Sequence, residues 1–456
     1  MKIAQRHTIF SLCLIGLLHV TMVAALVVTP VVQSAPLPYA ATLAPRPLAT
    51  AIATLVDQAD LIVRAQVVQS KSQWNSSHTL IETEHTLAVR YMITGQERPT
   101  LLIRTDGGFL PEEGLGVRTS HTASFAPGEE VLLFLQESAN GYRVVGGETG
   151  KFTVLNAEAV SAFYHDHLAL SQMTTIILTE VEKQGRSATL PADWSAHEPT
   201  TSPHRLDANQ PVVDPKWPGA VPQINVKVNL NSVHIDDQGG SAEQFLETIT
   251  NALRTWSIIP EAGFTFLYDG DTASTTTEFN NKSEILFIAN GTNSQLGQAQ
   301  IWFTSSGAIV EADIWINDDY QLDATGNPAE NEIDLESAIL HELGHWLPLG
   351  HMSNANAVMY AVLGAGTRKV SLSADDIAGI VALYPCPAIS CIDPAYVGSA
   401  TMTPTVTTTA TVATPTPIPT ATATVVTPVP TVFPTPPPQH VTVTPTTGIF
   451  LPIVTR

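Results

Sequence analysis

Apolar residues in the first third of the chain recur at the short intervals typical of β-strands. Five segments are rich in Val, Ile, Leu and Thr and partly alternate between apolar and polar positions: Leu61–Gln69, Leu80–Ile93, Thr100–Thr105, Glu130–Leu135 and Tyr142–Val145. The Asn140-Gly141 pair separates two of them, and both residues tolerate the positive φ of a tight hairpin. We therefore expect residues 50–155 to form a small all-β domain, a barrel or a sandwich.

The periodicity then changes. Between Ser171 and Gln184 apolar residues fall every three or four positions, which predicts an amphipathic helix with Ser171 as its N-cap. Residues 185–215 are polar and rich in proline. We expect 156–215 to be a helix followed by a linker.

Residues 216–391 combine strand and helix patterns and predict a second globular domain of the α+β class. The segment Ser241–Trp256 reads as a helix that carries Phe245, Ile249, Leu253 and Trp256 on one face. Strands are expected at Ile224–Leu230, Phe264–Tyr268, Ile285–Ile288, Ala299–Phe303 and Ile309–Ile316.

The N-terminus has the pattern of an export signal. Lys2 and Arg6 precede an apolar run from Ile9 to Val28, and Val23-Ala24-Ala25 offers a cleavage site with small residues. We interpret 1–35 as a signal peptide, with an uncleaved membrane anchor as the alternative. Both alternatives predict a secreted or cell-surface protein.

The C-terminal tail cannot build a core. Residues 397–447 are mostly Thr, Pro, Val and Ala, so we expect a disordered, extended stalk that could attach the protein to a cell surface. Residues 448–456 turn apolar again and are either a terminal tag or a frayed end.

The net charge and the cysteines indicate which partners and which redox compartment to expect. Lys and Arg total 21 against 42 Asp and Glu, for a formal charge of −21, which disfavours nucleic acid. The cysteines are Cys13, Cys386 and Cys391. Outside the cell we expect a disulfide between Cys386 and Cys391.

One motif contains candidate metal-binding and catalytic residues. Residues 341–345 read His-Glu-Leu-Gly-His, and the residues before them favour a helix with Asp334 as its N-cap. Side chains four apart on a helix lie one turn above each other, so His341 and His345 can bind one zinc ion. Glu342 lies beside that position and can take a proton from zinc-bound water.

The third zinc ligand is the next question, since catalytic zinc sites use three protein ligands and an open position. No glutamate follows His351, which excludes a downstream Glu ligand. The other candidates downstream are Asp375, Asp376, Asp393 and His440, of which His440 lies in the stalk and the first two open a helix. We therefore predict His351 as the third ligand.

Three further segments accompany the motif: Asp334-Leu335-Glu336-Ser337, Ala357-Val358-Met359-Tyr360 and Leu372–Ile380. With His351 they make residues 217–385 resemble the metzincin zinc metalloproteases, and among them the matrixins. The resemblance implies a zincin-type fold, with a twisted, mostly parallel five-stranded sheet and three helices. It also implies that Met359 forms an apolar floor under the zinc ligands, and that a peptide substrate adds to the sheet edge at 297–303.

The chain departs from the matrixin pattern in two places. Pro348 stands where the family has glycine, and proline cannot adopt the positive φ of that turn, so we expect Gly350 to make the turn instead. Matrixins are commonly kept inactive by a propeptide cysteine, but residues 14–385 contain none. Any inhibition by the N-terminal domain must therefore use bulk or a different ligand.

A calcium site is a weaker expectation. Asp313, Asn317, Asp318 and Asp319 could hold Ca²⁺, but they lack EF-hand-like ligand spacing, and we favour a solvated acidic turn.

The sequence thus predicts a secreted, monomeric zinc endopeptidase that acts on proteins or peptides. Two alternatives stay open. One is a non-catalytic surface adhesion protein on a zincin-like scaffold, which Pro348 favours. The other is a zinc hydrolase of non-peptide esters.

Overall fold

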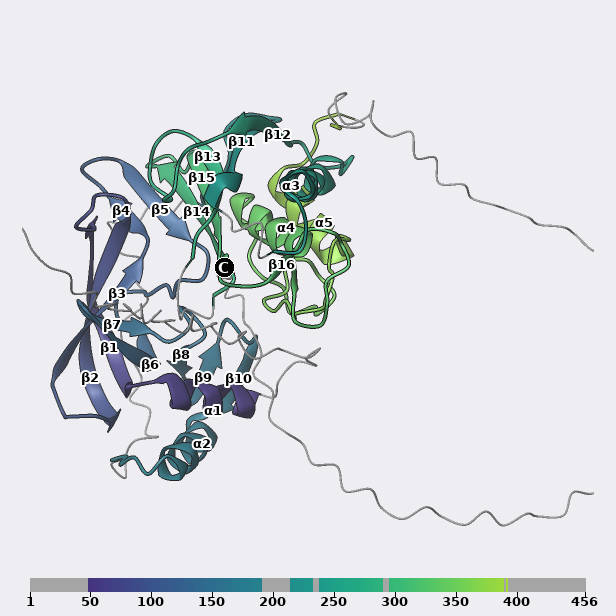
Figure 1. Ribbon diagram of the computed structural model, residues 1–456. Coiled ribbons are helices and arrows are strands. Elements are labelled where there is room, and N and C mark those ends of the chain that lie inside the picture. Colours follow the sequence, from purple (N-terminus) through teal and green to yellow (C-terminus); the bar gives the residue numbers. More distant parts are fainter. Residues whose placement is uncertain (1–47, 191–213, 233–237, 290–294, 389–390, 393–456) are drawn as a thin grey trace, which may run out of the picture. The chain divides into compact units, whose positions relative to one another are not determined.

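The computed structural model describes residues 48–190, 214–232, 238–289, 295–388 and 391–392 (Figure 1). The expected signal peptide at 1–35, stalk at 397–447 and tag at 448–456 lie outside these residues, as does most of the linker. Among the described residues, no helix is both long enough and apolar enough to cross a membrane.

The first region is built on an eight-stranded sheet with the strand order β1-β2-β3-β7-β6-β8-β9-β10. An additional β1–β6 pairing closes five of these strands into a ring. The bounds are β1 Leu61–Trp74, β2 Ile81–Thr94, β3 Thr100–Asp106, β6 Glu130–Ser138, β7 Gly141–Val144, β8 Lys151–Leu155, β9 Glu158–Ser161 and β10 Asp166–Ala169.

This region is not all-β, which corrects the expectation for residues 50–155. Helix α1 (Leu48–Gln58) opens it and buries Ile52 and Val56 completely, and α2 (Leu170–Lys183) packs against α1. The sequence pattern found α2 but misplaced its start, because Ala169, without a side-chain hydrogen bond, is the N-cap in place of Ser171.

The second region has the expected mixed α+β architecture. Its own strands lie in the order β12-β11-β13-β15-β14, in which β14 alone runs antiparallel to its neighbour. The bounds are β11 Gln223–Asn229, β12 Thr265–Asp271, β13 Ser283–Phe287, β14 Gly297–Thr304, β15 Ile309–Ile316, β16 Leu322–Asp323, β17 Ile333–Asp334, the 3-10 helix η1 Leu230–Ser232, α3 Ala242–Ser257, α4 Leu335–Trp346 and α5 Ala374–Leu383.

Helices α3 and α4 pack against each other and against this sheet (Figure 1). Helix α3 starts with a capping box at Ser241, and its expected apolar face is buried, with Phe245 and Trp256 fully inside. The Trp256 indole donates to the carbonyl of Leu340 at 2.8 Å, which fixes α3 against α4. The core therefore holds α4, the helix of the His-Glu motif, in a fixed position.

The two regions share one sheet. Strands β4 (Gly108–Leu110) and β5 (Leu115–Thr119) come from the first region, and β5 pairs antiparallel with β14. The full order is therefore β12-β11-β13-β15-β14-β5-β4. The edge at 297–303, which we expected to be open, is covered in large part by the chain itself.

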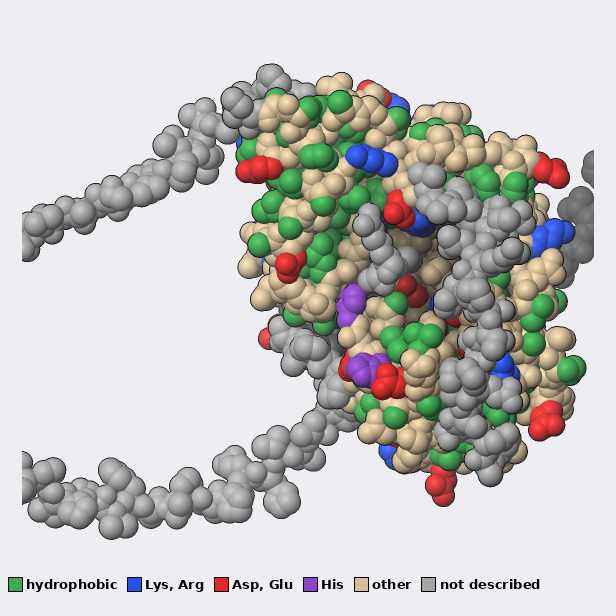
Figure 2. Space-filling model, turned by 180° about the vertical axis from the view of Figure 1, so that it is seen from behind, with side chains coloured by type: hydrophobic (Ala, Val, Ile, Leu, Met, Phe, Trp, Pro, Cys, Tyr) green, Lys and Arg blue, Asp and Glu red, His purple; other side chains and the backbone are tan. Residues whose placement is uncertain are grey.

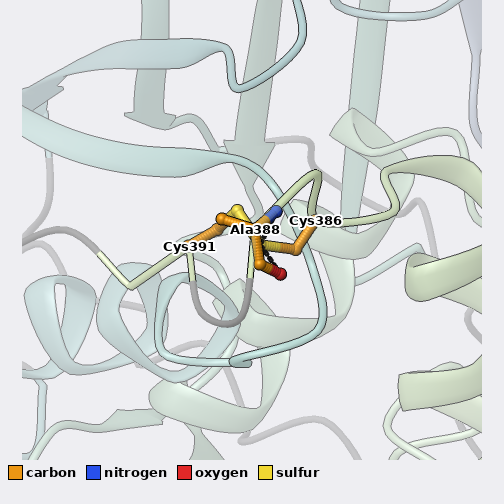
Figure 3. The surroundings of a disulfide bond; sticks show 3 residues. All are labelled: Cys386, Ala388 and Cys391. Carbon is orange, nitrogen blue, oxygen red and sulfur yellow. Dashed lines mark hydrogen bonds between the residues drawn. A yellow bond between two sulfur atoms is a disulfide. The ribbon is translucent and has the colours of Figure 1, made fainter.

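Cys386 and Cys391 form a disulfide with a Cα–Cα distance of 5.7 Å, directly after α5 (Figure 3). The Cys386 sulfur also accepts a hydrogen bond from the backbone N–H of Ala388. On the face shown in Figure 2, acidic and basic side chains are scattered among neutral and apolar surface.

Candidate metal centre

Helix α4 positions the first two histidines. Asp334 caps it by accepting a hydrogen bond from the Ser337 N–H at 2.8 Å, and nearly all of the helix is buried. His341 and His345 therefore project from successive turns into the interior, where they are 2% and 8% exposed.

His351 reaches the same point from the loop after α4. The N–H of Leu349 bonds to the carbonyl of Gly344 at 3.0 Å, which turns the chain back under the helix. The Nε2 atoms of His351 and His341 are 2.9 Å apart, and His341, His345 and His351 offer ligand atoms that all lie within 4.8 Å of one another. The structure thus brings together the three residues that the sequence suggested.

The hydrogen bonds of the rings leave the converging nitrogens available. The Nδ1 atoms of His341 and His345 lie 2.8 Å from the carbonyl oxygens of Val358 and Leu349. Because a carbonyl can only accept, both Nδ1 atoms carry the proton and both Nε2 atoms present lone pairs. The buried Nε2 of His345 has no hydrogen-bond partner among the described residues, so its lone pair is free to bind a cation.

Electrostatics favours neutral rings here. Burial lowers the pKa of His341 to about 3 and that of His345 to about 4, and it lowers the pKa of His351 as well. Neutral imidazole is the form that binds a metal. A buried set of three nitrogen donors suits Zn²⁺ better than a hard, oxygen-preferring cation.

The turn between His345 and His351 corrects one expectation. Pro348 itself has a φ of 26°, in the region that favours glycine, and Gly350 is not among the described residues with positive φ. The turn is therefore made at the position where matrixins have glycine, and it places strain on the proline backbone. Leu347 ends α4 as its C-cap, as the proline predicts.

Met359 lies fully buried beneath α4. A Cβ atom added to Gly344 would come within 2.2 Å of the Met359 sulfur, so the helix approaches the methionine through its glycine. Asp376 holds this turn from below, because its carboxylate accepts the N–H groups of Val358 at 2.9 Å and Met359 at 3.0 Å. The carbonyl of Val358 in turn orients His341.

Glu342 lies on the other side of the histidines, 1% exposed. Burial raises the pKa of its carboxyl group, so the group can gain as well as lose a proton. Its Oε1 atom lies 3.2 Å from the Nε2 of His121, and its Oε2 accepts a hydrogen bond from the Ser120 hydroxyl at 3.4 Å.

Sequence reasoning missed His121 and Ser120. They lie 221 and 222 residues before Glu342, and neither belongs to a recognisable motif. His121 is 2% exposed and has a φ of 77°, and His121, Glu342 and His345 form a second group whose ligand atoms lie within 4.8 Å of one another. Only the fold reveals this contact.

A cleft of about 980 Å³ adjoins the centre. His345 and His351 line it from the second region, and Ser120 and Phe125 line it from the first. The cleft offers a route by which a metal ion or small molecule could reach the histidines.

The residues considered for calcium are not a solvated turn, contrary to our preference. Asp313 and Asn317 are fully buried and Asp318 is 6% exposed, while Asp319 is exposed. Asp313 accepts a hydrogen bond from the N–H of Glu284 at 3.1 Å, and Asn317 donates to the carbonyl of Gln295 at 3.1 Å. These contacts give Asp313 and Asn317 a structural role.

Comparison with known proteins agrees with this geometry. Residues 226–385 match the family model described as matrixin. Metalloendoproteinase 1 from Glycine max is 31% identical over 174 residues, which cover 37% of this chain and 53% of the relative. Metalloendoproteinase 1-MMP from Arabidopsis thaliana is 49% identical over 73 residues (16% of this chain, 19% of the relative), and human matrilysin is 54% identical over 48 residues (10% and 18%).

The chain thus spans between about a fifth and about half of the length of these relatives. The matched segment contains the His-Glu motif, the third histidine and the methionine turn. Residues 226–385 of this chain are therefore similar to the matrixins.

Proposed function

We propose that this protein is a zinc-dependent endopeptidase that hydrolyses peptide bonds in proteins or peptides. The observation that carries the proposal is the convergence of three buried imidazoles, His341, His345 and His351, next to the buried carboxyl group of Glu342. The names of the relatives, metalloendoproteinases and a matrilysin, support the same activity.

In this proposal His341, His345 and His351 hold the zinc ion. A zinc ion held there would supply Lewis acidity toward the scissile carbonyl and would lower the pKa of a water molecule to about 7. Glu342 accepts the proton of the attacking water and then donates it to the leaving amine. Met359 packs beneath α4 and keeps its histidines in register, and the Val358 and Leu349 carbonyls fix the two ring tautomers.

We also propose that the protein is exported, as a monomer, and held at the cell surface by its C-terminal stalk. The support is the charged and apolar pattern of residues 1–35 and the Thr/Pro composition of 397–447. The disulfide between Cys386 and Cys391 fits an oxidising compartment.

One alternative function is supported by specific features of the structure. The strained Pro348 and the covered edge of β14 would suit a non-catalytic adhesion protein on the same scaffold. Metal content distinguishes the two, since a folded chain that takes up no stoichiometric zinc would favour adhesion.

The test compares Glu342→Gln with Glu247→Gln, an exposed glutamate on α3, in the full chain. Because His121 contacts Glu342, each variant is made with and without His121→Ala. We expect all chains to bind zinc and only the Glu342→Gln chains to lose cleavage of casein or of a fluorogenic peptide. Cleavage that survives Glu342→Gln would refute its role, and cleavage of esters but not peptides would favour an ester hydrolase.

A further inference from the structure

We propose that residues 115–122 are a built-in inhibitor, which occupies the substrate-binding edge of the sheet and covers the metal centre with His121. The proposal rests on the proposed function, because it assigns the regulation of that site. It is carried by contacts between the two regions of the chain.

The first observation is the pairing of β5 with β14. The register joins Leu115 with Thr304 and Thr119 with Gln300, so β5 lies along the edge strand as an added, antiparallel strand. An extended peptide that binds by strand addition needs these same backbone groups. While β5 is in place, such a peptide cannot bind there.

The second observation is the way in which the segment leaves the strand. The N–H of Ser120 bonds to the Ala299 carbonyl at 2.8 Å, and the Ser120 hydroxyl accepts the N–H of Ala299 at 2.9 Å. The backbone then departs at His121, whose φ of 77° is rare for a residue with a side chain. Strained backbone of this kind persists where the surrounding structure holds it, often at functional sites.

The third observation is the contact with the chemistry of the site. Ser120 and His121 each bond to a different oxygen of Glu342, so the proposed general base is engaged on both sides. The His121 and His345 rings lie edge to face with centroids 5.6 Å apart, and the buried Nδ1 of His121 has no hydrogen-bond partner in the part of the chain that the structure describes. His121 thus lies against Glu342 and His345 at the metal centre, with a nitrogen available as a further metal ligand.

The segment is arranged as an inhibitor and not as a peptide ready for cleavage. The Ser120 carbonyl accepts a hydrogen bond from the Gln298 side chain at 3.1 Å. The His121 carbonyl packs so closely on Gly147 that a Cβ there would lie 1.8 Å from its oxygen. The Ser120 carbonyl is therefore engaged by a side chain, and the His121 carbonyl packs on the Gly147 backbone.

Other residues of the first region hold residues 115–122 in place. The Thr119 hydroxyl donates to the Thr122 hydroxyl at 2.7 Å and lies 3.3 Å from the carbonyl of Asp106. Because the inhibitor is part of the same chain, its binding to the site is intramolecular and does not depend on the protein concentration.

The experiment uses the zinc-loaded full chain and two matched pairs of variants. His121→Ala is compared with His167→Ala, an exposed histidine on β10 of the same region. Gly147→Ala, which should push the His121 carbonyl away, is compared with Gly185→Ala, because both glycines have a φ near 66° but Gly185 has no atom within 4 Å of an added Cβ. Circular dichroism checks that each variant folds. If Gly147→Ala does not fold, the comparison of His121→Ala with His167→Ala alone tests the proposal.

Two readouts are taken for each chain: the cleavage rate of a fluorogenic peptide, and the dissociation constant of a peptide hydroxamate measured calorimetrically, which needs no turnover. We expect His121→Ala and Gly147→Ala to raise the rate and tighten hydroxamate binding by about tenfold or more, since apparent affinity scales with the open fraction. The two control variants should match the wild type.

Full activity of the zinc-loaded wild type, with His121→Ala unchanged in both readouts, would overturn the inhibitor. Failure of every chain to bind zinc would instead overturn the proposed function, and the inhibitor with it. Zinc content therefore tells the two failures apart.

Discussion

Replacing Asp376 with asparagine should weaken both the fold and the metal centre, although Asp376 touches no proposed zinc ligand. Its buried carboxylate accepts four hydrogen bonds: from Val358 N at 2.9 Å, Met359 N at 3.0 Å, Ser373 N at 2.8 Å and Ser373 Oγ at 2.8 Å. Asparagine keeps the shape but turns one oxygen into an NH₂ donor. In either orientation at least one buried N–H then faces another donor.

The magnitude follows from that count. A hydrogen bond to a charged group contributes about 1.5–3 kcal/mol, and an unsatisfied buried donor costs about 1–3 kcal/mol. We expect Asp376→Asn to lower the free energy of unfolding by about 2–4 kcal/mol. Because the Val358 carbonyl orients His341, zinc affinity should fall by about 10–100-fold as well.

Urea unfolding and competition with a zinc chelator measure the two effects. The matched control is Asp375→Asn, because Asp375 is exposed and its side chain bonds to that of Asn354. We expect the control to stay within about 0.5 kcal/mol of the wild type. If Asp376→Asn and Asp375→Asn behave alike in both assays, the reasoning about this turn is wrong.

Three further predictions concern packing, strain and pH. Gly344→Ala should lower the free energy of unfolding by about 1–3 kcal/mol, because the added methyl group clashes with Met359. In the double variant, Met359→Ala should relieve part of that loss. If urea unfolding shows that the two losses are additive, the clash is contradicted. Pro348→Gly should raise stability, since relief of about 1–3 kcal/mol of strain exceeds the roughly 0.5–1 kcal/mol entropic cost of glycine; a lower melting temperature would count against this. Burial, with a smaller contribution from Lys151, lowers the pKa of His85 to about 3. The unfolded chain therefore binds the proton more tightly, and this contribution to stability, complete above the unfolded pKa, falls by about 2 kcal/mol at pH 5 and further towards pH 3. His85→Gln should flatten the loss of stability between pH 7 and pH 5, and an unchanged slope would refute the assignment.

The sequence predicted what depends on local spacing. His341 and His345 converge because a helix brings residues four apart onto one face, and the Asp334 N-cap and the α3 apolar face follow from the same periodicity. Periodicity could not place His351 and Met359 at the site, because both follow α4 in a loop. His351 was predicted by eliminating the other downstream ligands, and Met359 was predicted from the resemblance to matrixins.

What the sequence could not predict depends on contacts between distant segments. The pairing of β5 with β14 joins residues about 180 positions apart, and nothing in the alternation of β5 says which edge it will cover. The proline ring of Pro348 led us to expect that this residue could not adopt a positive φ. The surrounding turn nevertheless holds it there. The burial of Asp313 and Asn317 likewise comes from their place in and after the central strand β15, which a run of acidic residues does not reveal.

The central claim is that three imidazoles hold one zinc ion. The most direct test measures bound zinc in the full chain after zinc loading and dialysis, in the wild type and in a His351→Ala variant, with His167→Ala as control. We expect one zinc per chain in the wild type and the control, with nitrogen ligands at about 2.0–2.1 Å by X-ray absorption, and a marked loss of zinc in His351→Ala. A folded wild type without stoichiometric zinc, or zinc content that His351→Ala leaves unchanged, would contradict it.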